Sequence, residues 1–147
     1  MPVKPIPDDY PRVIPYLIIK DVGKLMDFLT QVFGAKQKKK MTLPDGSINH
    51  GEVKIGDSVI MMGKSSKDYP PVPAMIYIYV ENTDEAYNKA IKNGAKSIMK
   101  PADQFYGDRN AGVTDPWGNS WWIASHVEDV SPDEMQRRSE ERAKKQG

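Results

Sequence analysis

Apolar residues along the chain follow two spacings, one typical of strands and one typical of helices. Residues 13–19 form a mostly apolar run interrupted by Pro15, and from Asp21 onward apolar residues recur at three- and four-residue steps until Gly34. The first spacing predicts a buried strand, and the second predicts an amphipathic helix that begins after Asp21 and ends at Gly34. Further strands are predicted at residues 36–43, 47–55 and 58–63, with glycine-containing turns between them.

The same order of elements is predicted a second time after residues 64–73, which are rich in proline, serine and lysine. Because each half of such a repeat cannot bury its apolar face alone, the two halves are expected to pair. The predicted fold class is therefore α+β, with two βαβββ repeats that form a curved mixed sheet covered on its outside by helices. In the second half we expect a strand at 75–80, a helix capped by Thr83 and stopped by Gly94, and strands near 96–100, 110–114 and 120–125.

The predicted domain organisation has three parts. A polar C-terminal helix is predicted because Ser131-Pro132-Asp133-Glu134 has the pattern of a capping box, and arginine and lysine crowd the far end. A helix that packs lightly on the body or on a dimer mate is favoured over a nucleic-acid-binding helix, since the overall charge is balanced. The parts are a proline-rich lead-in (1–12), a single domain (13–130) made of repeats 13–63 and 74–126, and the polar helix (131–147).

Composition restricts the classes of partner and compartment. The 147 residues carry 21 Lys and Arg against 20 Asp and Glu, so the net charge of +1 provides no global field that gathers nucleic acid or an anionic membrane. The lack of cysteine excludes disulfides, thiol nucleophiles and thiolate metal sites. The lead-in has no apolar signal core and no run approaches the length of a membrane span. These features predict a cytoplasmic protein with neither nucleic acid nor membrane as a partner.

Three segments near the end of the second repeat resemble a known family. They are Tyr106–Arg109, Asp115–Gly118 and Trp121–Asp129. Through them the chain resembles the glyoxalase/bleomycin-resistance/dioxygenase superfamily, also called the vicinal oxygen chelate superfamily, in its PhnB-like branch. The resemblance implies an open cup on the inner face of the sheet, where small-molecule ligands bind, and a homodimer.

Metal-using members of that superfamily take one ligand from the first strand and one from the last strand of each repeat. Counted from the helix cap and from the turn glycine, the ligand positions fall on Ile14, Ile60, Met75 and Trp122, and a shift by one residue gives Pro15, Met61, Ile76 and Ile123. A divalent cation requires oxygen or imidazole donors, and these apolar side chains offer none. We therefore expect no metal at the usual site and no cofactor.

His50 and Glu52 are the candidate catalytic residues. Strand alternation places both on the face away from the helix, about 7 Å apart along the strand. A histidine and a carboxylate in this arrangement are candidates for an acid/base pair or for a divalent metal site at an unusual position. The simpler interpretation is a histidine that is hydrogen-bonded to a tyrosine or a glutamate and takes part in no reaction.

Aromatic residues are predicted to line the cup. Strand alternation turns Tyr16, Tyr77, Tyr79 and Trp122 toward it. A lining that is aromatic and mostly neutral suits a flat, partly apolar ligand held by ring stacking. The same rings are also typical of an ordinary filled core, so both interpretations stay open.

Tyr106 and Arg109 are expected at the mouth of the cup and complete the predicted ligand-binding set. The planar fork of Arg109 could bind a carboxylate or phosphate of a ligand, with Asp108 orienting it. The alternative is that Asp108 and Arg109 only lock a turn.

Three functional hypotheses follow from these residues. The leading one is a metal-independent small-molecule binding protein of the glyoxalase/bleomycin-resistance type that holds an aromatic or amphipathic ligand in the cup. The alternative is a superfamily enzyme, a lyase, isomerase or dioxygenase, that uses a relocated metal or an acid/base pair at His50 and Glu52. The third is a DNA- or protein-interaction module that acts through a lysine-rich strand edge and the basic tail.

Overall fold

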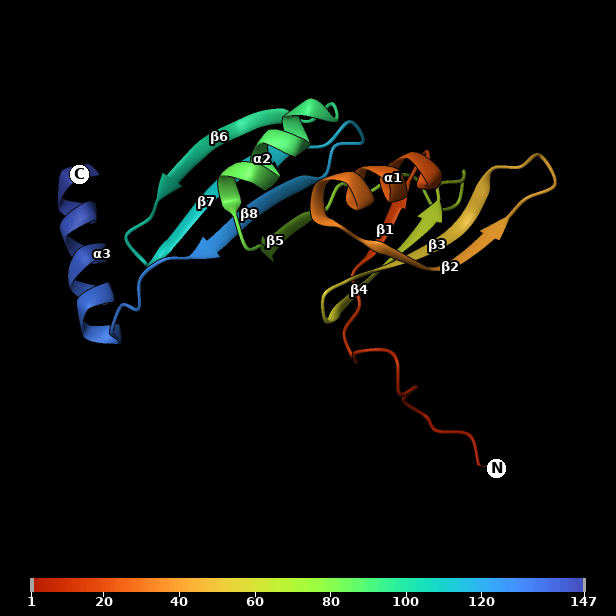
Figure 1. Cartoon of the computed structure of the whole chain (residues 1–147), viewed down its shortest axis with the longest axis horizontal. Coiled ribbons are helices and arrows are strands. Elements are labelled where there is room, and N and C mark those ends of the chain that lie inside the picture. Colours follow the sequence, from red (N-terminus) through yellow and green to blue (C-terminus); the bar gives the residue numbers. More distant parts are fainter. Residues whose placement is uncertain (1, 147) are drawn as a thin grey trace. The chain divides into compact units, whose positions relative to one another are not determined.

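The computed structural model describes residues 2–146, which divide between Ala74 and Met75 into two compact units (Figure 1). Each unit contains one βαβββ repeat, and the second unit adds a helix at its end. The first unit consists of β1 (Tyr16–Ile19), α1 (Val22–Phe33), β2 (Lys36–Thr42), β3 (Ile48–Ile55) and β4 (Ser58–Lys64). The second consists of β5 (Met75–Tyr79), α2 (Thr83–Lys92), β6 (Lys96–Asp103), β7 (Asp108–Thr114), β8 (Ser120–His126) and α3 (Pro132–Gln146).

Each repeat forms its own four-stranded mixed sheet. The strand order is β1-β4-β3-β2 in the first unit and β5-β8-β7-β6 in the second. In both sheets the first strand pairs in parallel with the last strand, and the remaining neighbours are antiparallel. This shared topology confirms the predicted α+β fold of two βαβββ repeats followed by a C-terminal helix.

One helix packs on one face of each sheet. The apolar stripe of α1 is buried, with Leu25 and Leu29 fully inaccessible to solvent. The helix lies so close to β3 that a Cβ atom on Gly51 would be 2.5 Å from the sulfur of Met26. Since α1 and α2 each pack on one face of their own sheet, the polar and aromatic side chains on the other face of each sheet are the ones that can meet a ligand.

Two element boundaries differ from the sequence prediction. β1 begins at Tyr16, and Val13 is 85% exposed, because Pro15 cannot donate a ladder hydrogen bond. The cap of α2 is Asn82, whose side chain accepts a hydrogen bond from the backbone of Glu85. The predicted cap at Thr83 is therefore wrong by one residue. Asn and Thr are both good caps, so composition alone does not decide between neighbouring positions.

The helix α3 is held on the loop between β6 and β7. Arg138 donates a hydrogen bond to the carbonyl oxygen of Phe105 at 2.9 Å and pairs with Glu128 and Glu134. The guanidinium of Arg142 lies 4.9 Å from the centre of the Phe105 ring. These contacts link α3 to the loop without burying any of its residues. The 15 residues of α3 are mostly polar or charged, and no helix within residues 2–146 is both long and apolar enough to cross a bilayer.

Replacing Arg138 with alanine should loosen the β6–β7 loop, because the variant loses the bond to Phe105 and the ion pair with Glu128. Amide hydrogen exchange at residues 105–107, measured by mass spectrometry, is expected to accelerate about three- to tenfold, the factor that corresponds to one lost hydrogen bond. The matched control is Arg137→Ala, since the ion pairs of Arg137 within residues 2–146 are with Glu134 and Glu141 on the helix surface. Equal exchange in the two variants would contradict the proposed contact.

Candidate ligand-binding site

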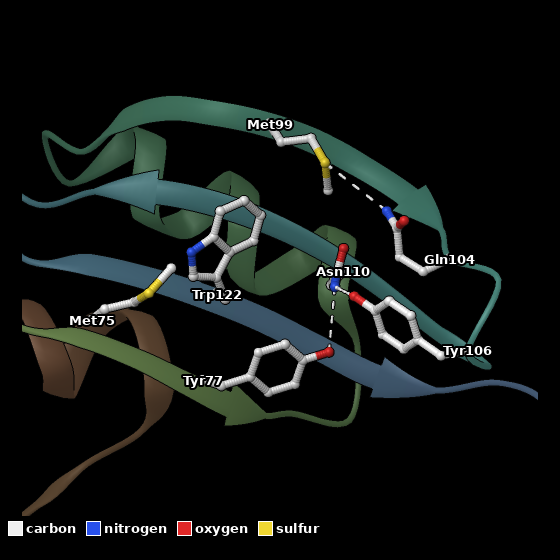
Figure 2. Close-up of a pocket in the computed structure, with 7 residues that line it drawn as sticks. All are labelled: Met75, Tyr77, Met99, Gln104, Tyr106, Asn110 and Trp122. Carbon is white, nitrogen blue, oxygen red and sulfur yellow. Dashed lines mark hydrogen bonds between the residues drawn. The ribbon is translucent and has the colours of Figure 1, made fainter. Parts of the chain in front are cut away.

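The second unit contains a cavity of about 440 Å³ on the face of the sheet opposite α2 (Figure 2). Its walls come from β5, β6, β7, β8 and the loop that precedes β7. The lining is apolar and aromatic with four amide or phenol side chains, and it includes no charged residue. The lining residues are Met75, Tyr77, Met99, Gln104, Tyr106, Asn110 and Trp122.

A glycine makes room for the largest ring of this cavity. Tyr77 in β5 pairs with Trp122 in β8, and Trp122 pairs on its other side with Gly112 in β7. A Cβ atom on Gly112 would be 2.8 Å from the Trp122 ring. The absence of a side chain at Gly112 therefore lets the indole lie against the sheet and form one wall of the cavity.

The Asp108 carboxylate fixes one end of the site. One of its oxygens accepts hydrogen bonds from the hydroxyl groups of Tyr77 and Tyr79, at 2.6 and 2.8 Å, and the other accepts from His126 at 3.0 Å. Burial favours the neutral acid, but the bonds from Tyr77, His126 and Tyr79 outweigh it and hold the pKa of Asp108 below its ordinary value. Burial, followed by the bond to Asp108, raises the pKa of Tyr77. The two phenols are therefore neutral donors at physiological pH.

His126 lies between two carboxylates. Its Nδ1 faces Asp108 at 3.0 Å and its Nε2 faces Asp129 at 2.7 Å. Because a carboxylate only accepts, both ring nitrogens are satisfied when each carries a hydrogen. The bond to Asp108, and after it the bond to Asp129, raises the pKa of His126.

The raised pKa of His126 predicts a pH-dependent contribution to stability. A group whose pKa is higher in the folded chain than its unfolded value of 6.5 stabilises the fold fully below that value, and this stabilisation is lost as pH rises through the folded pKa. The difference in melting temperature between the wild type and His126→Gln should therefore be larger at pH 6 than at pH 9. Thermal unfolding followed by circular dichroism at both pH values checks this. A difference that stays constant with pH would contradict it.

Two polar atoms of the cavity wall are buried without a hydrogen-bond partner among residues 2–146. They are Oδ1 of Asn110 and Nε1 of Trp122. The amide nitrogen of Asn110 is engaged, because it donates to the hydroxyl groups of Tyr106 at 2.6 Å and Tyr77 at 3.3 Å. Buried polar atoms in folded proteins nearly always have a partner, so these two atoms are the candidates in this cavity for hydrogen bonds to a bound molecule.

The first unit contains a second cavity, of about 550 Å³, on the face of its sheet away from α1. In it, Nε2 of His50 lies 2.8 Å from Glu52 and Nδ1 lies 3.1 Å from the hydroxyl of Tyr16. A Cβ atom on Gly63 would be 2.7 Å from that hydroxyl, so the glycine gives Tyr16 the space to reach His50. The second oxygen of Glu52 accepts from Tyr10 at 2.5 Å.

Tyr10 ties the lead-in to this network. Its bond to Glu52 raises the pKa of Tyr10 to about 12. Burial opposes ionisation of Glu52, yet the bonds from Tyr10 and His50 keep the pKa of that carboxyl below its ordinary value. Within the described chain, each oxygen and nitrogen of this cluster has a partner, in contrast to the cavity of the second unit.

The sequence matches the family model described as the Glyoxalase/Bleomycin resistance protein/Dioxygenase superfamily over residues 12–123. The chain belongs to this superfamily. It is 28% identical over 137 residues to the uncharacterized protein Mb0911c of Mycobacterium bovis, covering 86% of this chain and 90% of that one.

Solved structures of other proteins share the fold. TioX from Micromonospora sp. ML1 superposes with a TM-score of 0.69 at 21% identity, covering 80% of this chain and 99% of that one. A glyoxalase/bleomycin resistance protein/dioxygenase family enzyme from Burkholderia phytofirmans PsJN superposes with a TM-score of 0.64 at 19% identity, covering 78% and 97%. At these identities the likeness establishes the fold and leaves the ligand to be argued from this chain's own residues.

The positions at which metal-using members of the superfamily carry their ligands hold no donors here. The position transferred to Ile60 is wrong by one residue, because Ile60 pairs with Val53 and is buried on the α1 side. Met61 occupies the open face instead and lines a further cavity together with Ile14. Thioether and hydrocarbon side chains do not suit a divalent cation. Among residues 2–146 no cluster of three His, Asp or Glu side chains is arranged to hold a metal ion.

The predicted site residues separate into two groups. Tyr77, Tyr106 and Trp122 meet in the cavity of the second unit, and Tyr16, His50 and Glu52 meet in that of the first. Tyr79 lies outside both linings and supports Asp108. Arg109 lines neither cavity, because its guanidinium is paired with Asp84 and Asp103.

Sequence reasoning missed three residues of the second cavity. Met99 lies in the edge strand β6, within the range predicted for it, and Gln104 lies in the loop that follows β6. Asn110 begins the predicted strand 110–114. An isolated amide two residues before an inward-facing glycine was the signal that could have singled it out, because strand alternation puts Asn110 and Gly112 on one face.

Proposed function

We propose that this protein is a metal-independent small-molecule binding protein that holds a planar aromatic or amphipathic ligand in the cavity of the second unit. The observation that carries the proposal is an uncharged cavity of about 440 Å³ walled by Tyr77, Tyr106 and Trp122. Ligand pockets typically have volumes of roughly 300–1,000 Å³ and apolar walls with a few polar groups. Membership of a superfamily with small-molecule ligands supports the same interpretation.

Ring stacking provides the main attraction in this proposal. Trp122 is held against the sheet by Gly112, and Tyr77 is held by its bond to Asp108, so neither ring has to be ordered when a ligand binds. Preorganised aromatic contacts add roughly 0.5–1.5 kcal/mol each beyond the area they bury. Met75 and Met99 supply flexible apolar contacts that adjust to ligand shape.

The test is calorimetric titration with 1-methylindole, a neutral planar molecule. We expect a dissociation constant of roughly 0.1–1 mM, as suits a ligand of about ten heavy atoms. Met99→Lys places a charge in the second-unit cavity and should abolish binding. The matched control, Met41→Lys, places the same charge in the first-unit cavity and should leave binding unchanged.

Either of two results would contradict the proposal. The first is heat of binding that survives Met99→Lys and disappears in Met41→Lys, which would move the site to the first unit. The second is a complete lack of binding by the wild type at millimolar 1-methylindole.

A second candidate function is supported by the hydrogen-bond chain in the first unit. In the neutral imidazole of His50, Nε2 donates to Glu52, which leaves Nδ1 to accept the hydrogen of the Tyr16 hydroxyl. This arrangement suits a superfamily enzyme in which His50 and Glu52 act as an acid/base pair through Tyr16. Within residues 2–146 each side chain of this hydrogen-bond chain already has a partner, which favours the structural interpretation of His50 over the catalytic one.

The version of this candidate that uses a relocated divalent metal can be tested separately. If His50 and Glu52 held a metal, elemental mass spectrometry of the natively purified protein would show near-stoichiometric metal, and the His50→Ala variant would lose it. The ordered contact of His50 with Glu52 offers one imidazole and one carboxylate, two donors where divalent sites commonly use three or more protein ligands. We therefore expect no stoichiometric metal in either sample.

Two finer assignments accompany the proposal. The segments Tyr106–Arg109 and Trp121–Asp129 support membership of the PhnB-like branch, and the family resemblance supports a homodimer. Sedimentation equilibrium at micromolar concentration tests the dimer, for which we expect about twice the chain mass of 16.6 kDa.

A further inference from the structure

We infer that the ligand of the second-unit cavity is a neutral planar ring system that carries a hydrogen-bond acceptor for Trp122 at one edge and a hydrogen-bond donor for Asn110 at another. This inference rests on the proposed function and adds to it the chemical class of the ligand. The two atoms that carry it are Nε1 of Trp122 and Oδ1 of Asn110, which are buried and have no partner among residues 2–146.

Trp122 offers a donor with one bonding direction. An indole N–H can only donate, so its partner has to be an acceptor that the described chain does not supply. In Figure 2 this nitrogen points toward the thioether of Met75. Met75 is 73% exposed and unbranched, so it can swing aside and uncover the N–H for a ligand.

Asn110 offers an acceptor whose identity is set by its neighbours. The single hydroxyl hydrogen of Tyr77 is donated to Asp108 at 2.6 Å, so the Tyr77 oxygen can only accept from Asn110. The amide must therefore direct its NH₂ group toward Tyr77 and its oxygen away from it. That oxygen points to the side of the cavity where Met99 and Gln104 lie (Figure 2).

The fixed orientation of the Asn110 amide excludes a ligand that presents a hydrogen-bond acceptor to it. A ligand that offered only a second acceptor at this edge would face a carbonyl oxygen and be repelled. Asn110 is 2% exposed and lines the cavity, so its oxygen lies away from bulk solvent. A ligand N–H or O–H group is therefore the chemistry that completes this side chain.

The ligand is neutral because the lining provides no countercharge. All seven lining side chains are uncharged, and the nearby Asp108 carboxylate already accepts from Tyr77, Tyr79 and His126. Burying an ion here without a partner is strongly unfavourable. The chemical class is thus a neutral aromatic or heteroaromatic molecule with a carbonyl or similar acceptor and a separate N–H or O–H donor.

Four indoles of nearly equal size separate the two hydrogen bonds. Indole-3-carbaldehyde has donor and acceptor on different edges, 1-methylindole-3-carbaldehyde has only the acceptor, indole has only the donor, and 1-methylindole has neither. Calorimetry on the wild type should give about tenfold tighter binding for each group added, because one satisfied hydrogen bond corresponds to about that factor.

Protein variants assign each group to its atom. Trp122→Phe keeps a ring and removes the N–H, so it should erase the advantage of the aldehydes while the advantage of indole over 1-methylindole remains. In Asn110→Leu, methylation of the probe's indole nitrogen should no longer weaken binding, while the advantage of the aldehydes should remain. Trp117→Phe is the control, since Trp117 lies in the turn before β8 and lines no part of the cavity.

A second readout does not depend on the stability of the variants. In a ¹H–¹⁵N spectrum the indole signal of Trp122, identified by its loss in Trp122→Phe, should lie further downfield with each aldehyde than with the matching indole that lacks the aldehyde, because both members of a pair exert the same ring-current effect. Affinities of all four probes within about threefold, or an aldehyde advantage that persists in Trp122→Phe, would overturn the inference and leave the proposed function standing. Lack of binding by all four probes would overturn both.

Discussion

Replacing Asp115 with alanine is expected to lower the free energy of unfolding by roughly 3–5 kcal/mol, because several buried donors lose their acceptor together. Asp115 is buried in the turn before β8. Its carboxylate accepts hydrogen bonds from the backbone of Trp117 and Asn119, from the Asn119 amide and from the Trp121 indole, at 2.9–3.0 Å. The turn thereby anchors Trp121, the largest fully buried side chain of the described chain.

Urea denaturation followed by tryptophan fluorescence measures this loss. The control is Asp45→Ala, because Asp45 also accepts two hydrogen bonds within a turn but lies at the surface of the first unit. We expect the Asp45 variant to unfold close to the wild-type urea concentration. Comparable midpoints for the two variants would show that the Asp115 network does not anchor β8.

Replacing Asp108 with alanine is expected to reduce both stability and ligand affinity. The hydroxyl groups of Tyr77 and Tyr79 and the ring of His126 lose their common acceptor, which should cost roughly 2–4 kcal/mol of unfolding free energy. Since Tyr77 also sets the orientation of Asn110, the cavity wall becomes disordered. The affinity for 1-methylindole should fall at least about tenfold.

Asp103→Ala is the matched control for this prediction. Asp103 pairs with Arg109 at the surface of the same unit, and an exposed pair of this kind contributes less than about 1 kcal/mol. Thermal unfolding and calorimetry on both variants give the two readouts. An Asp108 variant that loses stability but keeps wild-type affinity would separate the Asp108 network from the ligand site.

The repeat architecture could be predicted because it depends on local patterns. The cap of α1 at Asp21 and its stop at Gly34, with φ of +68°, are encoded by residue types that act within a few positions. The error in the transferred metal-ligand positions occurs where residues are counted from a turn glycine into the following strand. β3 and β4 are joined by two residues and β7 and β8 by five, so counting from the turn glycine places Ile60 and Trp122 on opposite faces.

The candidate site could be predicted only in part. Strand alternation was sufficient to predict that Tyr77 and Trp122 lie on the face of the sheet that carries the second-unit cavity. It could not show that Arg109 would be held by Asp84 in α2, because such a pairing depends on how the helix packs. Nor could it show which polar atoms would be left without partners, because that depends on every neighbour within hydrogen-bonding distance.

Methionine-methyl NMR during titration with indole-3-carbaldehyde tests the central claim most directly. Met75 and Met99 line the second-unit cavity, Met41 lines that of the first unit, and Met26 and Met62 are buried in the first-unit core. We predict saturable shifts of the Met75 and Met99 methyl signals with no change at the other three. Shifts confined to Met41, or no saturable shift at Met75 and Met99, would contradict ligand binding in the second unit.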